Sequence, residues 1–197
     1  MKKSKVNMIA ICSLVLAFFF SGLTNSFAQA TYHAQKVDVL LTGTSSLHDW
    51  EMKSDKGQFD ATIAVAKDKV IFSGLSFNFP AESLKSGHGA MDKNTYKALD
   101  TKKNPNISFV LTSGNVTNTG SNTYLLKGMG KLTISGNTIL TDLVVTLKYN
   151  PADKSFTCSG TKKFKMTQYG VKPPTVMMGA IKTGDDVAIT YNLTIKS

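Results

Sequence analysis

The stretch Val187–Lys196, VAITYNLTIK, decides the fold class of this chain. Apolar side chains recur at every second position, and from Thr190 onward hydroxyl, amide and ammonium groups occupy the positions between them. A period of two is that of a β-strand with one buried and one wet face, which is typical of antiparallel sheets. The stretch therefore predicts an antiparallel strand with these inward residues: Val187, Ile189, Tyr191, Leu193 and Ile195.

The same alternation extends back along the chain to Val37, where we expect the first strand to begin. It recurs in the ranges 37–41, 59–65, 124–134 and 143–149, and turn-forming sequences rich in Gly, Asn, Asp and Pro separate these ranges. About eight strands with short connections and no alternating helices indicate an all-β barrel or sandwich. Gly128 and Gly130 interrupt one strand and indicate either room or a bend at that point.

Two segments depart from this pattern. Residues 91–103 lack Gly and Pro, carry Asp92 near one end and two lysines at the other, and predict a single short helix that caps one end of the barrel. The segment 169–180 contains Pro173 and Pro174, which forbid strand pairing, and predicts a loop. We expect its Met177 and Met178 to be partly covered by the rest of the protein.

Residues 1–30 have the composition of a secretory signal peptide. They contain a basic start, an apolar run from Met8 to Phe20, and small residues before two candidate cleavage sites, after Ala28 and after Ala30. The predicted mature domain spans residues 31–197 and is exported to the periplasm. Because Cys12 leaves with the signal, Cys158 remains alone and no internal disulfide is expected. A chain of about this length suffices for one domain with a sizeable core.

All 23 basic residues are lysines, and arginine is absent. Three of them lie in the signal segment and all 13 acids lie outside it, so the mature domain has 20 lysines and a net charge of about +7. Because bidentate recognition of phosphate and guanine favours arginine, we expect no nucleic-acid partner. Lysines on outward strand positions form a solvated face, which also permits weak attraction to an anionic membrane surface.

The segment Gly43–Trp50, GTSSLHDW, concentrates the chemically versatile side chains and includes the only tryptophan. If it is a strand, His48 and Asp49 lie on opposite faces and Trp50 shares the face of His48, which argues against a catalytic triad. The histidines at 33, 48 and 88 lack metal-ligand spacing, and we expect His33 in a flexible N-terminus. The sequence thus predicts no catalytic residues, no metal site and no required cofactor.

Five motifs in a fixed order resemble the YceI family of exported bacterial proteins, which are lipocalin-like barrels associated with polyisoprenoid binding. They run along essentially the whole mature chain and comprise Gly43–Trp50 with the following Gly57-Gln58-Phe59, Ser83–Gly87, Asn104–Phe109, Gly130–Gly136 and Phe164–Val171. The LHDW sequence and the loop at Lys172-Pro173-Pro174 resemble a branch of the family common in Bacteroidetes. These sequences differ from the first motif of better-known family members.

The resemblance implies an extended antiparallel eight-stranded lipocalin-like β-barrel around an apolar tunnel for an isoprenoid lipid, such as a polyprenyl lipid or a quinone. Burial of a prenyl tail supplies roughly 0.8 kcal/mol per methylene-sized group, so such a tunnel needs few polar contacts. We expect His48 and Tyr169 at the polar end, with lysines at the mouth steering an anionic head. The expected tunnel lining is Trp50, Phe72, Phe77, Phe109, Leu132, Leu143, Phe164 and Met166.

Three functions follow from these expectations. The first is non-enzymatic binding, transport or sequestration of an amphiphilic isoprenoid lipid. The second is a structural or stress-response interaction module whose barrel core is filled and holds no ligand. The third is an enzyme acting on a lipid head, for which His48 would be essential. The residues leave open which lipid is bound, whether the tunnel is hollow and whether the barrel forms a homodimer.

Overall fold

The computed structural model describes residues 29–66 and 69–197, so the predicted signal peptide lies outside the described residues except for Gln29 and Ala30. No helix of the described part is long and apolar enough to cross a membrane. The strands and helices follow one another as β1 (Gln29–Ser45), β2 (Trp50–Ser54), β3 (Gln58–Ala66), β4 (Lys69–Pro80), η2 (Ala81–Ser83), α2 (Gly89–Leu99), β5 (Asn106–Gly120), β6 (Thr123–Ile134), β7 (Asn137–Asn150), β8 (Ser155–Lys165), η3 (Met166–Tyr169), β9 (Thr175–Val176), η4 (Met177–Gly179) and β10 (Ile181–Lys196).

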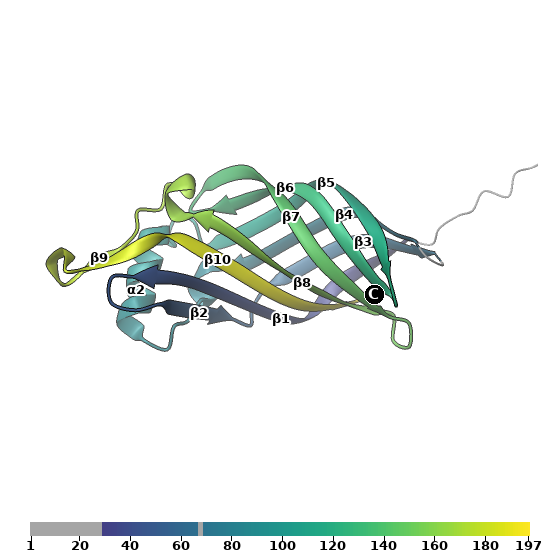
Figure 1. The fold of residues 1–197 in the computed structure, drawn as a ribbon, viewed down its shortest axis with the longest axis horizontal. Coiled ribbons are helices and arrows are strands. Elements are labelled where there is room, and N and C mark those ends of the chain that lie inside the picture. Colours follow the sequence, from purple (N-terminus) through teal and green to yellow (C-terminus); the bar gives the residue numbers. More distant parts are fainter. Residues whose placement is uncertain (1–28, 67–68) are drawn as a thin grey trace, which may run out of the picture.

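Eight of the strands close into an antiparallel barrel (Figure 1). Their order around the barrel is β1-β3-β4-β5-β6-β7-β8-β10, and β10 pairs back onto β1 along Lys196 to Thr183. The short strand β2 pairs with β1 on the edge that β3 uses nearer the start of β1, and its Met52 is fully buried in the core. The two-residue strand β9 pairs with the start of β10. An elongated, closed eight-stranded barrel with one α-helix confirms the predicted all-β, lipocalin-like architecture.

The predicted period of two places the core inside the barrel. In β10, Val187, Leu193 and Ile195 are buried, and Ile195 is fully enclosed. These residues are buried because β10 pairs along most of its length with both β1 and β8. The inward residues of the neighbouring strands meet it in one core that includes Tyr124, Leu126, Ile134, Val145, Leu147 and Phe156. The predicted inward faces of β6, β7 and β10 are therefore correct.

β1 begins at Gln29, well before Val37, where the sequence predicted the first strand. The extension forms because residues 29–33 pair with β3. At its end the His33 Nδ1 atom lies 2.7 Å from Asp60 Oδ1 of β3. The placement of His33 in a flexible N-terminus is therefore wrong, since both its backbone and its side chain hold a partner in the sheet.

Helix α2 is shorter and starts earlier than the predicted range 91–103. It ends at Leu99 because Asp100 adopts a left-handed conformation (φ 49°) and its N–H turns back to the carbonyl groups of Tyr96 and Lys97. At the other end, Ser86 donates hydrogen bonds from N and Oγ to Asp92 Oδ1, at 2.8 and 2.7 Å. These contacts fix the helix across one end of the barrel (Figure 1).

The predicted loop 169–180 contains irregular structure and the two-residue strand β9. The expectation that its methionines are covered is wrong: Met177 is 73% exposed and Met178 is fully exposed. Both lie at the turn of the β9–β10 hairpin, which projects beyond the barrel at the end where α2 lies (Figure 1).

The barrel wall is not hydrogen-bonded along its whole length between β7 and β8. Their ladder runs only from Asn150–Ser155 to Thr146–Ser159. Beyond that point β7 continues its pairing with β6, and β8 continues with β10, while the two strands diverge from each other (Figure 1). The wall there depends on side chains, which include an ion pair between Asp142 of β7 and Lys162 of β8.

Candidate ligand cavity

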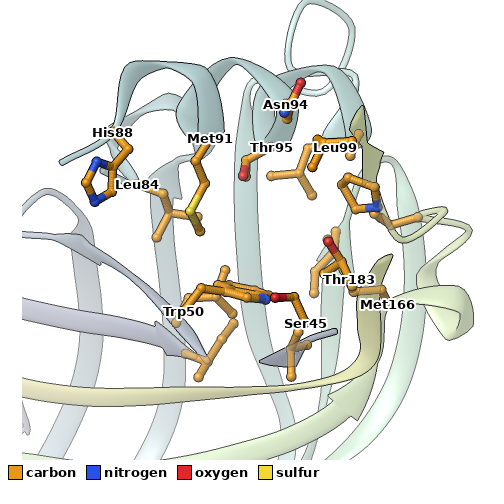
Figure 2. A pocket seen from close by; sticks show the side chains of 18 of the residues that line it. Ser45, Trp50, Leu84, His88, Met91, Asn94, Thr95, Leu99, Met166 and Thr183 are labelled. Atoms are coloured by element: carbon orange, nitrogen blue, oxygen red, sulfur yellow. The ribbon is translucent and has the colours of Figure 1, made fainter. Parts of the chain in front are cut away.

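A cavity of about 580 Å³ lies between α2 and the barrel end. Figure 2 shows Leu84, Met91, Thr95 and Leu99 on its helix side, and Trp50, Ser45, Thr183 and Met166 on the opposite side. The volume lies within the range of about 300–1,000 Å³ that is typical of small-molecule sites. We call this space cavity 1, and its presence shows that this part of the barrel is not filled by side chains.

The segment Gly43–Trp50 forms a hairpin at the rim of cavity 1, which corrects its prediction as a strand. β1 ends at Ser45 and β2 begins at Trp50, so His48 and Asp49 lie in the turn. Ser45 Oγ accepts hydrogen bonds from the N–H groups of Leu47 and His48, both at 3.2 Å, and donates to the His48 carbonyl oxygen at 2.7 Å. The hydroxyl run therefore builds the turn, as serine does in side-chain-stabilised turns.

Trp50 forms part of the wall of cavity 1 because two contacts hold its indole. Its Nε1 donates to the Thr44 carbonyl oxygen at 2.9 Å. Its ring lies against Gly43, where a Cβ atom would come within 2.2 Å of the ring. Since the indole nitrogen is already paired, Trp50 presents only its apolar surface to the cavity.

The polar side chains around cavity 1 carry hydroxyl, amide and imidazole groups. Among the described residues that border it there is no Asp, Glu or Lys. The expectation that lysines at the mouth steer an anionic head has no support in this lining. His48 Nδ1 lies 2.6 Å from the Asp49 carbonyl oxygen, which can only accept, so Nδ1 is the donor in this contact and Nε2 takes no part in it.

Tyr169 is a buried tyrosine in the wall of cavity 1. The residue is only 2% exposed, packs edge-on against Phe164 and borders cavity 1. Burial raises the pKa of its hydroxyl, so this group stays protonated and can donate a hydrogen bond. Every fully buried side-chain oxygen of the described residues has a hydrogen-bond partner, and no hydrogen bond to another described residue is found for the Tyr169 hydroxyl, so this oxygen is not fully buried.

A second, smaller cavity of about 90 Å³ lies deeper in the barrel, and we call it cavity 2. It is bordered by aromatic and aliphatic residues of β3 to β8 and β10, and by Asp142 and Lys162, which form an ion pair across the gap between β7 and β8. The hydrogen bond from Lys162 holds the pKa of Asp142 below its ordinary value. The two cavities share three wall residues, Phe79, Ile107 and Ile189.

All ten residues predicted for a single tunnel border one of the two cavities. Trp50, Phe164, Met166, His48 and Tyr169 border cavity 1, while Phe72, Phe77, Phe109, Leu132 and Leu143 border cavity 2. The structure therefore divides the predicted lining into two groups that meet at the shared wall. Contact of these residues with a lipid stays a prediction.

The sequence analysis missed the contribution of α2 to the site. Met91, Thr95 and Ala98 border cavity 1 and lie four and three residues apart, so they share one helix face. Leu99, one turn on from Thr95, is buried and also borders the cavity. The Tyr96 hydroxyl instead donates to the carbonyl oxygens of Leu84 and Glu82, at 2.8 and 2.9 Å, and holds the helix to the preceding segment.

The described residues contain no cluster of three or more His, Cys, Asp or Glu side chains that could hold a metal ion. Burial raises the pKa of the Cys158 thiol to about 12, so this thiol is neither a metal ligand nor a nucleophile at neutral pH.

Comparison with known proteins gives one family and several similar folds. The profile of the YceI-like domain family matches residues 41–195. No curated protein sequence matches the chain. The crystal structure of BcnA from Burkholderia cenocepacia superposes with a TM-score of 0.61 at 21% identity, covering 80% of this chain and 95% of that one.

Two further solved structures have the same fold. A polyisoprenoid-binding domain from Saccharophagus degradans, implicated in plant cell wall breakdown, has a TM-score of 0.59 at 10% identity and covers 84% of this chain and 98% of its own. The YCEI protein of Campylobacter jejuni has a TM-score of 0.50 at 17% identity, with 71% and 82% covered. At these identities the structural likeness shows the fold alone.

Proposed function

This chain belongs to the YceI-like domain family, and from that premise we propose that it binds and carries, or sequesters, an amphiphilic isoprenoid lipid in its barrel. One observation carries the proposal: cavity 1 is large, lies at one end of the barrel and is lined mainly by apolar side chains. The similar fold of the polyisoprenoid-binding domain from Saccharophagus degradans supports the same class of ligand.

The lining of the two cavities favours a ligand with an uncharged head and an apolar tail. A phosphate or pyrophosphate head in cavity 1 would lose its water without meeting a lysine, which costs several kcal/mol per charge. A prenol or quinone head needs only hydrogen bonds, which the Tyr169 hydroxyl and the His48 imidazole can supply. Cavity 2 then lies where the tail of a longer chain would extend, beyond Phe79, Ile107 and Ile189.

We propose a binding role without catalysis. Ser45 donates its hydroxyl proton to the His48 backbone carbonyl oxygen rather than to the imidazole. The imidazole in turn contacts the carbonyl oxygen of Asp49 instead of a carboxylate. These contacts build a turn, and a Ser-His-Asp relay would need the opposite partners.

Direct extraction tests the ligand class. The protein is purified from the envelope of its own host without detergent exchange, and organic extracts are analysed by mass spectrometry. We expect a neutral prenyl lipid, either a quinone or a prenol. Absence of any co-purifying lipid, together with no binding of added prenols, would support the runner-up function, a structural module without a ligand.

Trp50 provides a direct signal for titration because it is the only tryptophan and borders cavity 1. We expect its fluorescence to change on addition of a long-chain prenol, and the affinity for the matching prenyl phosphate to be lower. Tyr169→Phe removes the hydroxyl alone and should weaken prenol binding about three- to tenfold. The hydrocarbon squalene lacks a head group and is the control ligand, whose affinity should not change.

The proposed location is the periplasm. This rests on the signal-like composition of residues 1–30, most of which lie outside the described residues. A lone, buried thiol with no disulfide among the described residues is compatible with an exported protein that relies on its barrel core for stability.

A further inference from the structure

Two neighbouring hairpin tips at one end of the barrel carry exposed apolar side chains. Met177 and Met178 lie at the tip of the β9–β10 hairpin and are 73% and fully exposed, and Leu47 at the tip of the β1–β2 hairpin is 67% exposed. The β9–β10 hairpin projects beyond the barrel wall (Figure 1). Large exposed apolar side chains grouped at one place mark an interaction surface.

The two tips form one fixed rim. The N–H of Ser46 donates to the Lys182 carbonyl oxygen at 2.9 Å, and the N–H of Lys182 donates to Ser46 Oγ at 3.1 Å. Met177 and Met178 also adopt left-handed backbone conformations, with φ of 52° and 55°. Such conformations are unfavourable for non-glycine residues, and here the exposed side chains contribute no packing to the barrel in return.

This rim is continuous with the ligand cavity. Leu47, Val176 and Ile181 border cavity 1, so apolar surface runs from the exposed tips into the binding space. From Val171 to Gly184 the only ionisable side chains are Lys172 and Lys182. Both are exposed, and neither forms an ion pair in the described part of the chain. The β9–β10 hairpin therefore has apolar methionines at its tip and two lysines closer to the barrel. The tip of the β1–β2 hairpin carries one acidic residue, Asp49.

We propose that this end of the molecule docks on an anionic lipid bilayer. Met177, Met178 and Leu47 enter the interfacial region, and Lys172 and Lys182 lie at the level of the anionic headgroups, where each lysine adds attraction. A lipid surface fits better than a protein partner because the tips are narrow and projecting, and a stable protein interface needs roughly 1,000 Å² or more of matched area. Unbranched methionine side chains also adapt to a fluid surface.

Docking in this orientation places cavity 1 directly above the lipids that would fill it. This consequence rests on the proposed lipid-binding function, whereas docking itself does not. The bilayer need not release an apolar chain into water, because the rim offers a continuous apolar path from the membrane into the barrel.

The test compares two double glutamine variants of the full chain in flotation with vesicles of phosphatidylcholine and phosphatidylglycerol. Met177→Gln with Met178→Gln should reduce partitioning about tenfold or more, since two side chains lose most of their transfer free energy. Met129→Gln with Leu140→Gln changes exposed residues of the barrel wall and should leave partitioning unchanged. Equal binding by both variants, or no binding by the unmodified protein, overturns the proposal.

Two further measurements distinguish membrane docking from lipid binding in the barrel and from dimer formation. Prenol uptake from vesicles should slow in the tip variant, while its equilibrium affinity for prenol added without vesicles, followed by Trp50 fluorescence, should be unchanged. If the protein floats with vesicles but binds no prenol, docking stands and the proposed function fails. If sedimentation instead shows a dimer that the tip variant abolishes, without vesicle binding, the rim joins two copies of the chain and docking is excluded.

Discussion

Gly43 determines where the tryptophan of the cavity wall lies. A Cβ atom at this position would come within 2.2 Å of the Trp50 ring, far inside contact distance. We expect Gly43→Ala to displace the indole, to shift the Trp50 emission and to lower the free energy of unfolding by about 1–3 kcal/mol. Denaturant unfolding followed by fluorescence measures both effects. Gly74→Ala is the control, because nothing lies within 4 Å of its Cβ, and an equal loss in that variant would contradict this account.

Cys158 makes the stability of the barrel dependent on pH in the alkaline range. Burial raises the pKa of its thiol from 9.0 to about 12. The unfolded chain therefore loses this proton above pH 9 while the folded chain keeps it, so the unfolded state binds fewer protons and the free energy of unfolding falls as pH rises from about 9 to 12. By pH 10.5 the loss from this group is about 2 kcal/mol relative to pH 8.

Urea unfolding at these two pH values, compared between the unmodified protein and Cys158→Ala, measures this contribution. The variant should lose about 2 kcal/mol less on going to the higher pH, even if its stability at pH 8 is lower because of the cavity that the substitution leaves. The folded protein should also resist thiol reagents at pH 8. Rapid modification without unfolding would show that the thiol is accessible.

Residues of special conformation explain why element ends were harder to predict than element types. The alternation in Val187–Lys196 identified β10, because a period of two with one apolar face leaves few other structures. The turn in Gly43–Trp50 was missed because it depends on the Ser45 hydroxyl accepting from the N–H groups of Leu47 and His48. The end of α2 was missed because Asp100 adopts a left-handed conformation, which is uncommon for residues other than glycine.

At the scale of the elements, β7 and β8 form the least regular part of the barrel wall. Where their ladder stops, the hydroxyl of Tyr191 on β10 passes over Gly160 of β8 and donates to the Val144 carbonyl oxygen of β7 at 3.1 Å. A Cβ atom at Gly160 would come within 2.3 Å of that hydroxyl, so glycine is required for this contact. The hydrogen bond replaces a missing backbone pair between the two strands.

Loss of this bond should loosen β7 without unfolding the barrel. We expect Tyr191→Phe to lower the free energy of unfolding by about 1 kcal/mol and to increase amide hydrogen exchange in residues 139–145 of β7 and 160–164 of β8. The control is Tyr149→Phe, because the Tyr149 ring packs against Phe156 and its hydroxyl forms no hydrogen bond among the described residues. Unchanged exchange in Tyr191→Phe would show that the bond contributes nothing to the wall.

At the scale of the whole molecule, the strand pattern predicts an all-β barrel or sandwich, and only the family resemblance implies a closed barrel with a tunnel. Alternation along each strand predicts which side chains point inward. All ten residues predicted to line the tunnel border one of the two cavities. Whether inward side chains fill an eight-stranded barrel depends on their summed volumes and on how the helix covers the end. Here α2 lies across the end of the barrel, opposite Trp50, and cavity 1 lies between them (Figure 2). The spacing between the helix and the barrel end cannot be read from the alternation of the strand sequences.

The shared wall of the two cavities should determine which chain lengths the barrel accepts. Ile189 borders both cavities, so Ile189→Ala removes apolar volume between them and should join the spaces at a cost of about 2–4 kcal/mol in stability. A short prenol that occupies cavity 1 alone should bind somewhat more weakly because it loses contacts. A long prenol should gain room for its tail, so the ratio of long-chain to short-chain affinity should rise severalfold. Titrations followed by Trp50 fluorescence measure that ratio, and Val144→Ala, on the outer face of β7, is the control. An equal loss for both chain lengths would mean that the ligand does not extend past Ile189, which would confine binding to cavity 1.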